Sequence, residues 1–403
     1  MDRSKMIKIS VIGDIMCEAP VLQQAKRTNG YNFRPIFAPM KALFSESDLV
    51  VGNLETPLAG EEAGYSPDIF SFNAPDSLAA DLKDIGIGLV STANNHTFDR
   101  GMDGLTRTIK VLDDVGLLHT GTAVSSTEDR TAYLEINGTK LAFIAATYGV
   151  NETPKDVLKN NVPIPNINML KPFRDFPTHV YEPEVVQTRA YIEEKCGCKM
   201  SYMDLCALKH AMGIPVPYAD DWIDPNLSIP YLDVLEKDYQ DARKSADLVF
   251  FLPHTGGQFN TKPGEFSRFM VTWALSVGFD AVLAAHSHTT QMAQIIHRVP
   301  CFYSLGNVTM SPNTSYAELE TLPEYGLAAH LYLSDKKVAK TTFSVFKIVE
   351  DPSTPLYVIP VDELHQKLDT DDEKKRLEKD VAEIYTRVTG RSQFCGIERE
   401  YDL

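Results

Sequence analysis

The sequence places two histidines, His286 and His288, one residue apart directly after the apolar run FDAVLAA. In an extended chain, residues two apart point to the same face, so the two imidazoles would lie side by side. No carboxylate separates them, and two protonated imidazoles would repel each other. The spacing indicates two neutral imidazoles that share a metal ion, although two surface histidines in a loop would have the same spacing. The other apolar runs of the chain decide between these interpretations.

Polar residues follow five other short apolar runs in the same way. The runs end at Asp14, at Asn53 and Glu55, at Asn94, Asn95 and His96, at His254, and at Asn307. Near-continuous apolar runs are typical of strands that are buried on both faces. Ligands of open α/β sheets bind beyond the carboxyl ends of such strands, so we expect these side chains to converge at one edge. The sequence therefore predicts one site built from the ends of six strands.

Carboxylates, an amide oxygen and imidazoles are the ligand types of a hydrolytic transition-metal site. The candidate metal ligands are Asp14, Glu55, Asn95, His254, His286 and His288. This donor set favours Mn, Fe or Zn over Ca, and it suffices for one or two ions. Near neutral pH, a hydroxide bound to such ions would be the nucleophile, so no serine or cysteine is needed.

His96 follows the candidate ligand Asn95 and is available for proton transfer. We expect His96 to protonate a leaving group as a general acid, and Asp99 to orient its ring. The candidates for substrate binding are Asn53, Asn94 and Asn307. Taken alone, Asp14 could be a helix N-cap and Asn95 a turn residue. Their joint placement at strand ends favours a catalytic metal site.

Helical patterns and hairpins separate the apolar runs. Helices are predicted over residues 33–47, 76–86, 103–116 and 264–278, and hairpins over 131–147 and 326–346. The first hairpin turns on Asn137 and Gly138, which is a strong type I′ signal. Helix-linked strands mixed with hairpins indicate an α/β fold in which two mixed sheets pack together and are flanked by helices.

Composition divides the chain into a catalytic part and two additions. Residues 1–350 carry the motifs and are predicted to form a catalytic domain. Within it, residues 151–230 are rich in proline and are predicted to be a cap-like insertion that sets specificity, with a decorative insertion as the alternative. Residues 351–403 are predicted to be a helical extension, whose charged helix over 362–391 breaks near Thr370.

The charge of the chain excludes several classes of partner. With a formal net charge of −16, the surface should repel nucleic acid and anionic lipid. No apolar run approaches the length of a signal peptide or a membrane span, and the six cysteines show no framework spacing. We therefore expect a cytoplasmic protein with a small-molecule or peptide substrate and no membrane insertion. The oligomeric state stays open.

The motifs occur in a characteristic order. They are GD at 13–14, GNLE at 52–55, ANNH at 93–96, YGVN at 148–151, HTG at 254–256, HSH at 286–288 and YSLGN at 303–307. This order resembles the CapA-type poly-γ-glutamate capsule biosynthesis family, a branch of the calcineurin-like metallophosphatases, over roughly residues 7–345. The resemblance implies a four-layer α/β/β/α sandwich with a metal site on loops at one edge of the sheets. By position, it implies the same six metal ligands, with His96 as the catalytic histidine.

The resemblance implies a divalent-metal-dependent hydrolase of the phosphoester type. The wider superfamily opens with Asp-x-His, where this chain has Met16, so the number of bound ions, one or two, stays open. The first alternative is a metal-assisted enzyme that modifies a peptide or polyglutamate by amide hydrolysis, transfer or epimerisation. There the metal would polarise a carbonyl while a histidine moves a proton. The second alternative is a non-catalytic, metal-containing protein that binds an acidic polymer.

Overall fold

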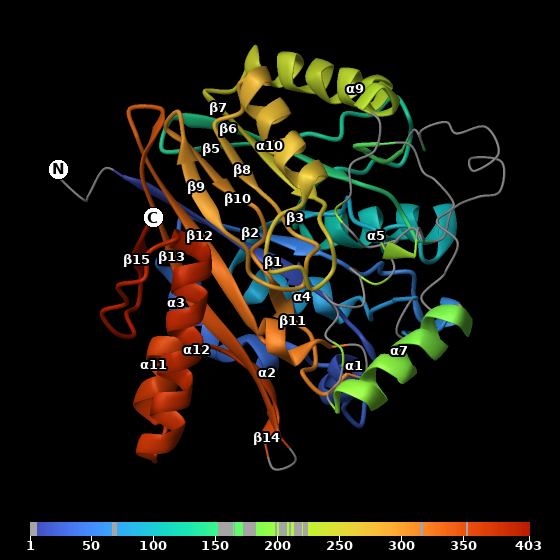
Figure 1. The fold of residues 1–403 in the computed structure, drawn as a ribbon. Helices are drawn as coiled ribbons and strands as arrows, with labels where there is room; N and C mark the ends of the chain where they lie inside the picture. Colours follow the sequence, from blue (N-terminus) through green and yellow to red (C-terminus); the bar gives the residue numbers. More distant parts are fainter. Residues whose placement is uncertain are drawn as a thin grey trace.

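Two mixed β-sheets face each other in the structure, which is a computed structural model (Figure 1). It describes residues 6–66, 71–151, 164, 166–171, 183–197, 200, 208, 211–212, 220, 225–314, 317–351 and 354–403. The larger sheet has the order β14 (Thr354–Pro360), β13 (Lys337–Asp351), β12 (Tyr325–Ser334), β1 (Ile7–Ile15), β2 (Leu49–Leu54), β3 (Ile87–Ser91) and β4 (Leu118–Thr120). The short strands β11 (Asn307–Thr309) and β15 (Tyr401–Asp402) pair with β1 and β13. The smaller sheet has the order β5 (Ala132–Ile136), β6 (Thr139–Thr147), β7 (Leu248–His254), β8 (Ala281–Leu283), β10 (Val299–Phe302) and β9 (Ala293–Ile296).

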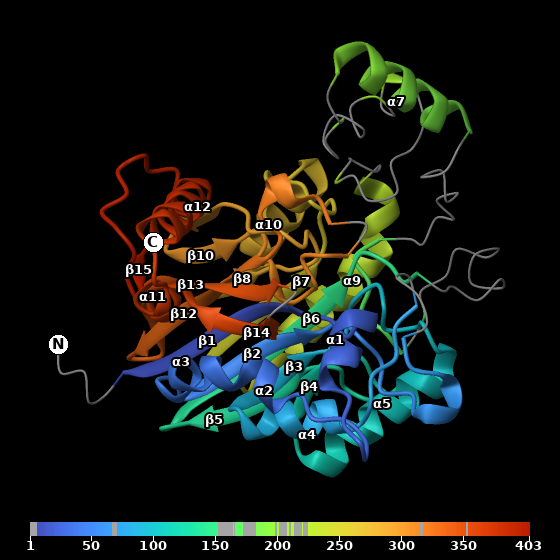
Figure 2. The same cartoon turned by 90° about the horizontal axis from the view of Figure 1, so that it is seen from below.

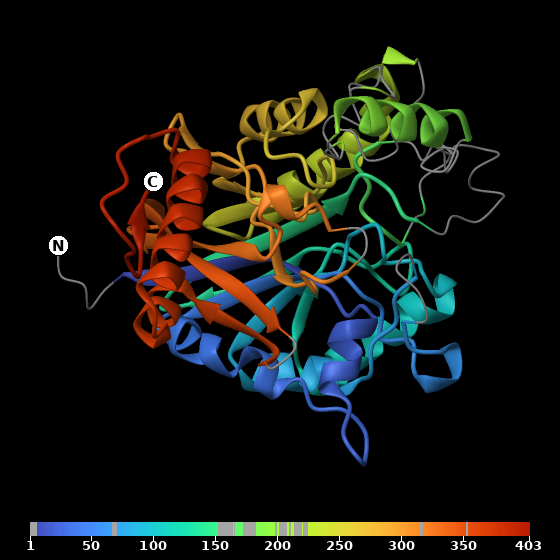
Figure 3. The same cartoon turned by 60° about the horizontal axis from the view of Figure 1, so that its bottom comes forward.

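Helices cover the outer face of each sheet (Figure 3). Against the larger sheet lie α1 (Ala19–Ala25), α2 (Arg34–Phe37), α3 (Lys41–Ser45), α4 (Ser77–Asp84) and α5 (Gly101–Val115). Against the smaller sheet lie α9 (Pro225–Arg243) and α10 (Glu265–Val277). The other helices are α7 (Pro183–Cys196), α11 (Val361–Lys367), α12 (Asp371–Thr389) and the 3-10 turns η2 (Ala38–Met40), η3 (Glu61–Ala63) and η5 (Leu319–Thr321).

Alternating side chains on buried strands create the layers. On β2, Val51 packs between the sheets while Val50 packs against the helices. On β7, Phe250 packs between the sheets while Phe251 packs under α9 and α10. Neighbouring residues of a strand point to opposite faces, so apolar residues on both faces bury a strand completely. The predicted α/β/β/α sandwich is therefore confirmed.

Several predicted elements follow the local chemistry that suggested them. The first hairpin turns at Asn137 and Gly138, whose φ angles of 49° and 77° suit a type I′ turn. The helix predicted over 33–47 is instead split into α2, η2 and α3. Pro39 lies in this segment and has no amide hydrogen to continue a helical ladder.

The C-terminal segment completes the sandwich rather than forming only a helical extension (Figure 2). The predicted boundary at residue 350 falls inside β13, and β14 then lengthens the larger sheet. The break expected near Thr370 is present, because Thr370 and Glu373 form a capping box that begins α12. The apolar face of α12, including Val381 and Ile384, belongs to the core between the sheets.

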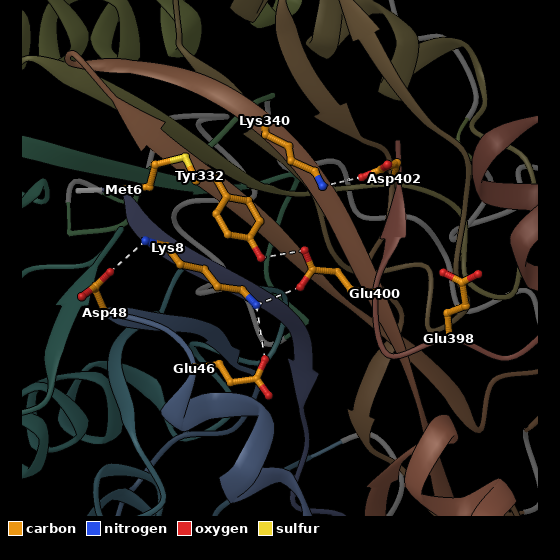
Figure 4. Close-up of a pocket in the computed structure, with 9 residues that line it drawn as sticks. All are labelled: Met6, Lys8, Glu46, Asp48, Tyr332, Lys340, Glu398, Glu400 and Asp402. Carbon is orange, nitrogen blue, oxygen red and sulfur yellow. Dashed lines mark hydrogen bonds and ion pairs between the residues drawn. The ribbon is translucent and has the colours of Figure 1, made fainter. Parts of the chain in front are cut away.

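Salt bridges tie the C-terminus to the start of β1 (Figure 4). The Lys8 ammonium lies 2.9 Å from a Glu400 carboxylate oxygen and 3.6 Å from Glu46. Tyr332 donates a hydrogen bond of 2.6 Å to Glu400. These groups line a cavity of about 580 Å³ at the end of β1 away from Asp14. Although burial raises the pKa of Glu400, its hydrogen bonds and the charges nearby lower it to about 2.

Most of the predicted insertion, residues 151–230, lies outside the described residues, so its role as a cap stays a prediction. The stretch 166–171 is described and buried. Ile167 bridges to Thr122, and Met169 bridges to Thr147 at the end of β6. This stretch therefore packs into the sandwich beside the ends of β4 and β6. None of the helices in the described part of the chain is long and apolar enough to cross a membrane.

Candidate metal centre

The carboxyl ends of parallel strands from both sheets meet at one place. Asp14, near the end of β1, pairs in register with Asn53 on β2 and with Asn307 on β11. Glu55 follows β2 directly, and its backbone amide donates to the carbonyl of Ile15, 3.0 Å away. The smaller sheet contributes His254 at the end of β7 and the loop after β8. Two sheets are thus needed to assemble one site.

The structure brings the six predicted metal ligands together. Asp14, Glu55 and His254 form one cluster, and Glu55, His286 and His288 form a second, with the ligand atoms of each cluster within 4.8 Å of one another. Glu55 belongs to both clusters. The remaining candidate, Asn95, places its side-chain oxygen 2.7 Å from Nε2 of His254. This arrangement could hold one ion, or two ions bridged by Glu55.

The donor atoms of this centre are buried, and several lack protein partners. Asp14, Glu55 and His286 are each 0% exposed. Among the described residues, no hydrogen-bond partner is found for either carboxylate oxygen of Glu55 or for Nε2 of His286. Leaving a buried polar group unsatisfied is costly, and a buried charge costs more. A divalent cation would satisfy these atoms, so the donor set fits a metal ion.

Electrostatics distinguish the two histidines of the H-S-H motif. Burial and the neighbouring histidines hold the pKa of His286 well below its usual value. Burial also lowers the pKa of His288, but the charge of Glu55 and a hydrogen bond to Asp14 raise it to about 9. Burial raises the pKa of Asp14, but its contacts with His288 and His254 bring it below the usual value. Metal ligands bind as neutral imidazoles, so metal binding would release the proton of His288.

Both histidines of the motif have unusual backbone conformations. The φ angle is 110° at His286 and 53° at His288. L-residues other than Asn and Asp seldom adopt positive φ, since the Cβ atom crowds the backbone. The backbone amide of His286 donates to Asp14 over 3.1 Å, which helps to hold this conformation. The strained turn places the imidazoles of His286 and His288 in the second ligand cluster.

His96 lies beside the cluster with a fixed ring orientation. Its Nδ1 lies 2.6 Å from Oδ2 of Asp99, and its ring stacks on Phe72 with centroids 4.0 Å apart. The backbone amide of Phe72 also donates to Asp99, over 2.6 Å. The predicted orientation of His96 by Asp99 is therefore present, and it directs Nε2 away from the carboxylate.

The three asparagines predicted to bind substrate have hydrogen bonds with protein groups. Asn53 donates to Asp14 over 2.8 Å, and its oxygen accepts from Asn94 over 3.2 Å. Asn94 also donates to the Leu54 carbonyl, 2.8 Å away. Asn307 places its oxygen 2.9 Å from Nδ1 of His288 and donates to the His288 carbonyl, also over 2.9 Å. Asn53 and Asn307 thus contact the candidate metal ligands Asp14 and His288, and substrate binding by the three asparagines stays a prediction.

Met16, whose position the motif resemblance assigns to a histidine, is only 2% exposed. Its side chain belongs to the apolar core between the larger sheet and its helices. A thioether packed there offers no imidazole to the cluster. The number of ions that bind therefore stays open.

The loop after β6 contains site residues that received no role from the sequence. The ring of Tyr148 lies 4.6 Å from the ring of His286, between centroids. Asn151 contacts both Asn95 and His96. Lys171 places its ammonium 5.5 Å from the centroid of the Tyr148 ring. The YGVN motif after a buried strand could have indicated this loop, whereas nothing in the sequence around Lys171 indicated a site.

Two solved structures are similar to this chain at low identity. A hypothetical protein from Thermus thermophilus is 15% identical with a TM-score of 0.39, and 88% of this chain and 98% of that chain are covered. A putative 5'-nucleotidase from Staphylococcus aureus, in complex with alpha-ketoglutarate, is 13% identical with a TM-score of 0.42, covering 94% and 58%. The fold is therefore assigned from the strand topology above.

Two curated relatives have a higher sequence identity with this chain than the two solved structures have. The uncharacterized protein y4sH of Sinorhizobium fredii is 24% identical over 305 residues, which are 70% of this chain and 63% of that protein. This chain thus spans less than two thirds of the length of y4sH. The PGA biosynthesis protein CapA of Bacillus subtilis is 23% identical over 369 residues, 90% of this chain and 76% of that protein.

The family comparison covers most of the chain. The family model described as bacterial capsule synthesis protein PGA_cap matches residues 8–311, which span the ends of β1, β2, β3, β7 and β8. The match includes the candidate metal centre and the His96–Asp99 pair. The resemblance stated from the motifs is confirmed, and the chain belongs to the PGA_cap family of bacterial capsule synthesis proteins.

Proposed function

We propose that the protein is a divalent-metal-dependent hydrolase of phosphoesters. The observation that carries this proposal is the pair of buried ligand clusters that share Glu55, whose carboxylate oxygens have no hydrogen-bond partner among the described residues. Beside them lies His96, which is oriented by Asp99 and is not part of either cluster. A metal site alone would need no such oriented histidine, whereas hydrolysis uses one.

The candidate ligands would hold Mn, Fe or Zn. When bound, the metal would supply Lewis acidity toward the phosphoryl oxygens and an activated water. The ligand set is Asp14, Glu55, Asn95, His254, His286 and His288. Asn53 and Asn307 would fix two of these ligands through hydrogen bonds, as outer partners commonly do.

His96 would supply the proton for the leaving group. Its Nδ1 faces Asp99, so Nε2 is the nitrogen that can face a substrate. As the oxygen of a water molecule bonds to phosphorus, the bond from phosphorus to the leaving oxygen breaks, and Nε2 of protonated His96 gives its proton to that oxygen. The attacking water loses one proton to solvent, and His96 is left neutral until it takes up a proton again. The Asp99 carboxylate would stabilise the protonated ring and hold its orientation. Neither serine nor cysteine is required as a nucleophile.

The direct test is turnover of an aryl phosphate by the full chain with added Mn²⁺. We expect turnover that EDTA abolishes and that Mn²⁺ restores. Elemental analysis should find a transition metal above background in the active protein. Metal binding without turnover of phosphoesters would contradict this proposal and leave the peptide-modifying enzyme and the non-catalytic protein that binds an acidic polymer.

A second candidate is supported by family membership. The matching family and the relative from Bacillus subtilis are named for capsule and PGA biosynthesis. On this proposal, the metal would polarise a peptide carbonyl while His96 moves a proton at the neighbouring carbon. A glutamate peptide that loses no mass but takes up deuterium from D₂O would indicate epimerisation. Cleavage of that peptide would indicate amide hydrolysis instead.

A further inference from the structure

Asn151 links the candidate metal ligand Asn95 to the candidate acid His96. Its backbone amide donates to the Asn95 carbonyl over 2.7 Å. Its side-chain oxygen accepts from Nδ2 of Asn95 over 3.2 Å. Its side-chain nitrogen lies 3.4 Å from each ring nitrogen of His96. One residue thus contacts both functional groups at the start of the 151–230 segment.

Asn151 differs from its neighbours in exposure. Asn95 is 1% exposed and His96 is 4% exposed, whereas Asn151 is exposed. The buried asparagines of the site, Asn53 and Asn94, have short contacts with protein groups. Asn151 is therefore the exposed residue of this group, and its side chain lies beside His96.

The contacts also fix which end of the Asn151 amide faces His96. Because Asn95 donates to Oδ1, the Nδ2 group turns toward the imidazole. The 3.4 Å distances from Nδ2 to the ring nitrogens are long for a hydrogen bond. A substrate oxygen placed beside His96 would be a better acceptor for an N–H of this amide, especially if that oxygen carries negative charge.

We propose that Asn151 is a substrate-binding residue that donates a hydrogen bond from Nδ2 to an oxygen of the group undergoing reaction. This inference rests on the proposed function. The amide would hold the scissile group between the metal centre and His96. It is a neutral donor, so it binds an anionic group without competing for the metal. A carboxylate at this position would repel the same group.

The test compares Asn151→Ala and Asn151→Asp with the wild-type full chain loaded with Mn²⁺. Asn313→Ala is the matched control, because Asn313 is also an exposed asparagine and its amide contacts Glu350. We expect Asn151→Ala to raise KM for an aryl phosphate about tenfold, the loss typical of one hydrogen bond to a charged group. Asn151→Asp should raise it further. The control should stay within twofold of wild type.

Two further measurements separate the outcomes. Calorimetric titration of inorganic phosphate into the Mn²⁺-loaded protein should show the same order of weakening, and Mn²⁺ content should be unchanged. An unchanged KM and phosphate affinity in an active protein would overturn the role of Asn151 alone. Loss of Mn²⁺ from Asn151→Ala would also overturn it, because the residue would then act only through Asn95. A wild-type chain that binds neither Mn²⁺ nor phosphate would overturn the proposed function and this inference together.

Discussion

At the scale of single residues, a substitution at His96 tests the chemical step separately from metal binding. It lies outside both ligand clusters but within 2.6 Å of Asp99. We expect His96→Asn to keep the metal and to lower kcat by about 10²–10⁴-fold, the usual contribution of a general acid. The loss should be smaller for substrates with good leaving groups, since these need no proton. Parallel measurement of kcat and metal content checks this, and equal loss of both would make His96 a ligand.

Asn307 allows the positioning role to be distinguished from substrate binding. Both ends of its side-chain amide contact His288, so its removal should disturb that imidazole. We expect Asn307→Ala to weaken metal binding about 10–100-fold, as is typical when a ligand loses its supporting partner. Competition with a chelator measures this affinity. A raised KM with unchanged metal affinity would return Asn307 to the substrate-binding role that the sequence suggested.

At the scale of elements, the larger sheet contains a buried histidine that links stability to pH. His330 on β12 lies between Ser10 and Ser344, at 2.6 and 2.9 Å, and burial lowers its pKa to about 3. The charge of Lys8 contributes to this lowering of the pKa, and the charge of Glu400 opposes it. In the unfolded chain, this group takes up a proton below its ordinary value of about 6.5. The contribution of His330 to the free energy of unfolding is therefore greatest above pH 6.5, and this contribution is lost as the pH falls toward 3.

The expected slope for His330 is about 1.4 kcal/mol per pH unit in the free energy of unfolding. A His330→Gln variant keeps an amide beside the two serines but removes the titration. Denaturant unfolding of both proteins between pH 6.5 and 4 measures the difference. If the free energies of unfolding of the two proteins differ by the same amount across that range, His330 is protonated in the folded protein.

The sequence predicted elements whose signals are local. Apolar runs identified β1, β2, β3, β7 and β8, and the polar residues at their ends identified the six candidate ligands. The break predicted near Thr370 likewise lies between α11 and α12, where the structure shows a capping box. The two-residue strand β15 could not be predicted, since it exists only by pairing with β13. The partners of Asn307 are also distant in sequence, so its contact with His288 was not predictable.

At the scale of the whole molecule, the candidate metal centre joins the two sheets. Asp14 and Glu55 come from the larger sheet, whereas His254, His286 and His288 come from the smaller one. A ligand that binds only the folded state stabilises it by about 2.7 kcal/mol at 100 times its Kd. We therefore expect Mn²⁺ or Zn²⁺ to raise the unfolding temperature and EDTA to lower it. An unfolding temperature that changes neither with these metal ions nor with EDTA would contradict a metal site between the sheets.

The positive φ angle of His286 implies that this position is poorly suited to its own side chain. In ordinary helices and strands, replacing alanine by glycine lowers stability by about 0.5–1 kcal/mol. At a φ of 110° the crowding of Cβ acts in the opposite direction, with a cost of about 1–2 kcal/mol for an L-residue. In metal-free protein, His286→Gly should therefore be at least as stable as His286→Ala, although both leave the same space where the ring was. Selection for folding alone would favour glycine here. The backbone therefore disfavours histidine at this position, and random libraries selected for thermal resistance in the presence of EDTA should replace His286 early.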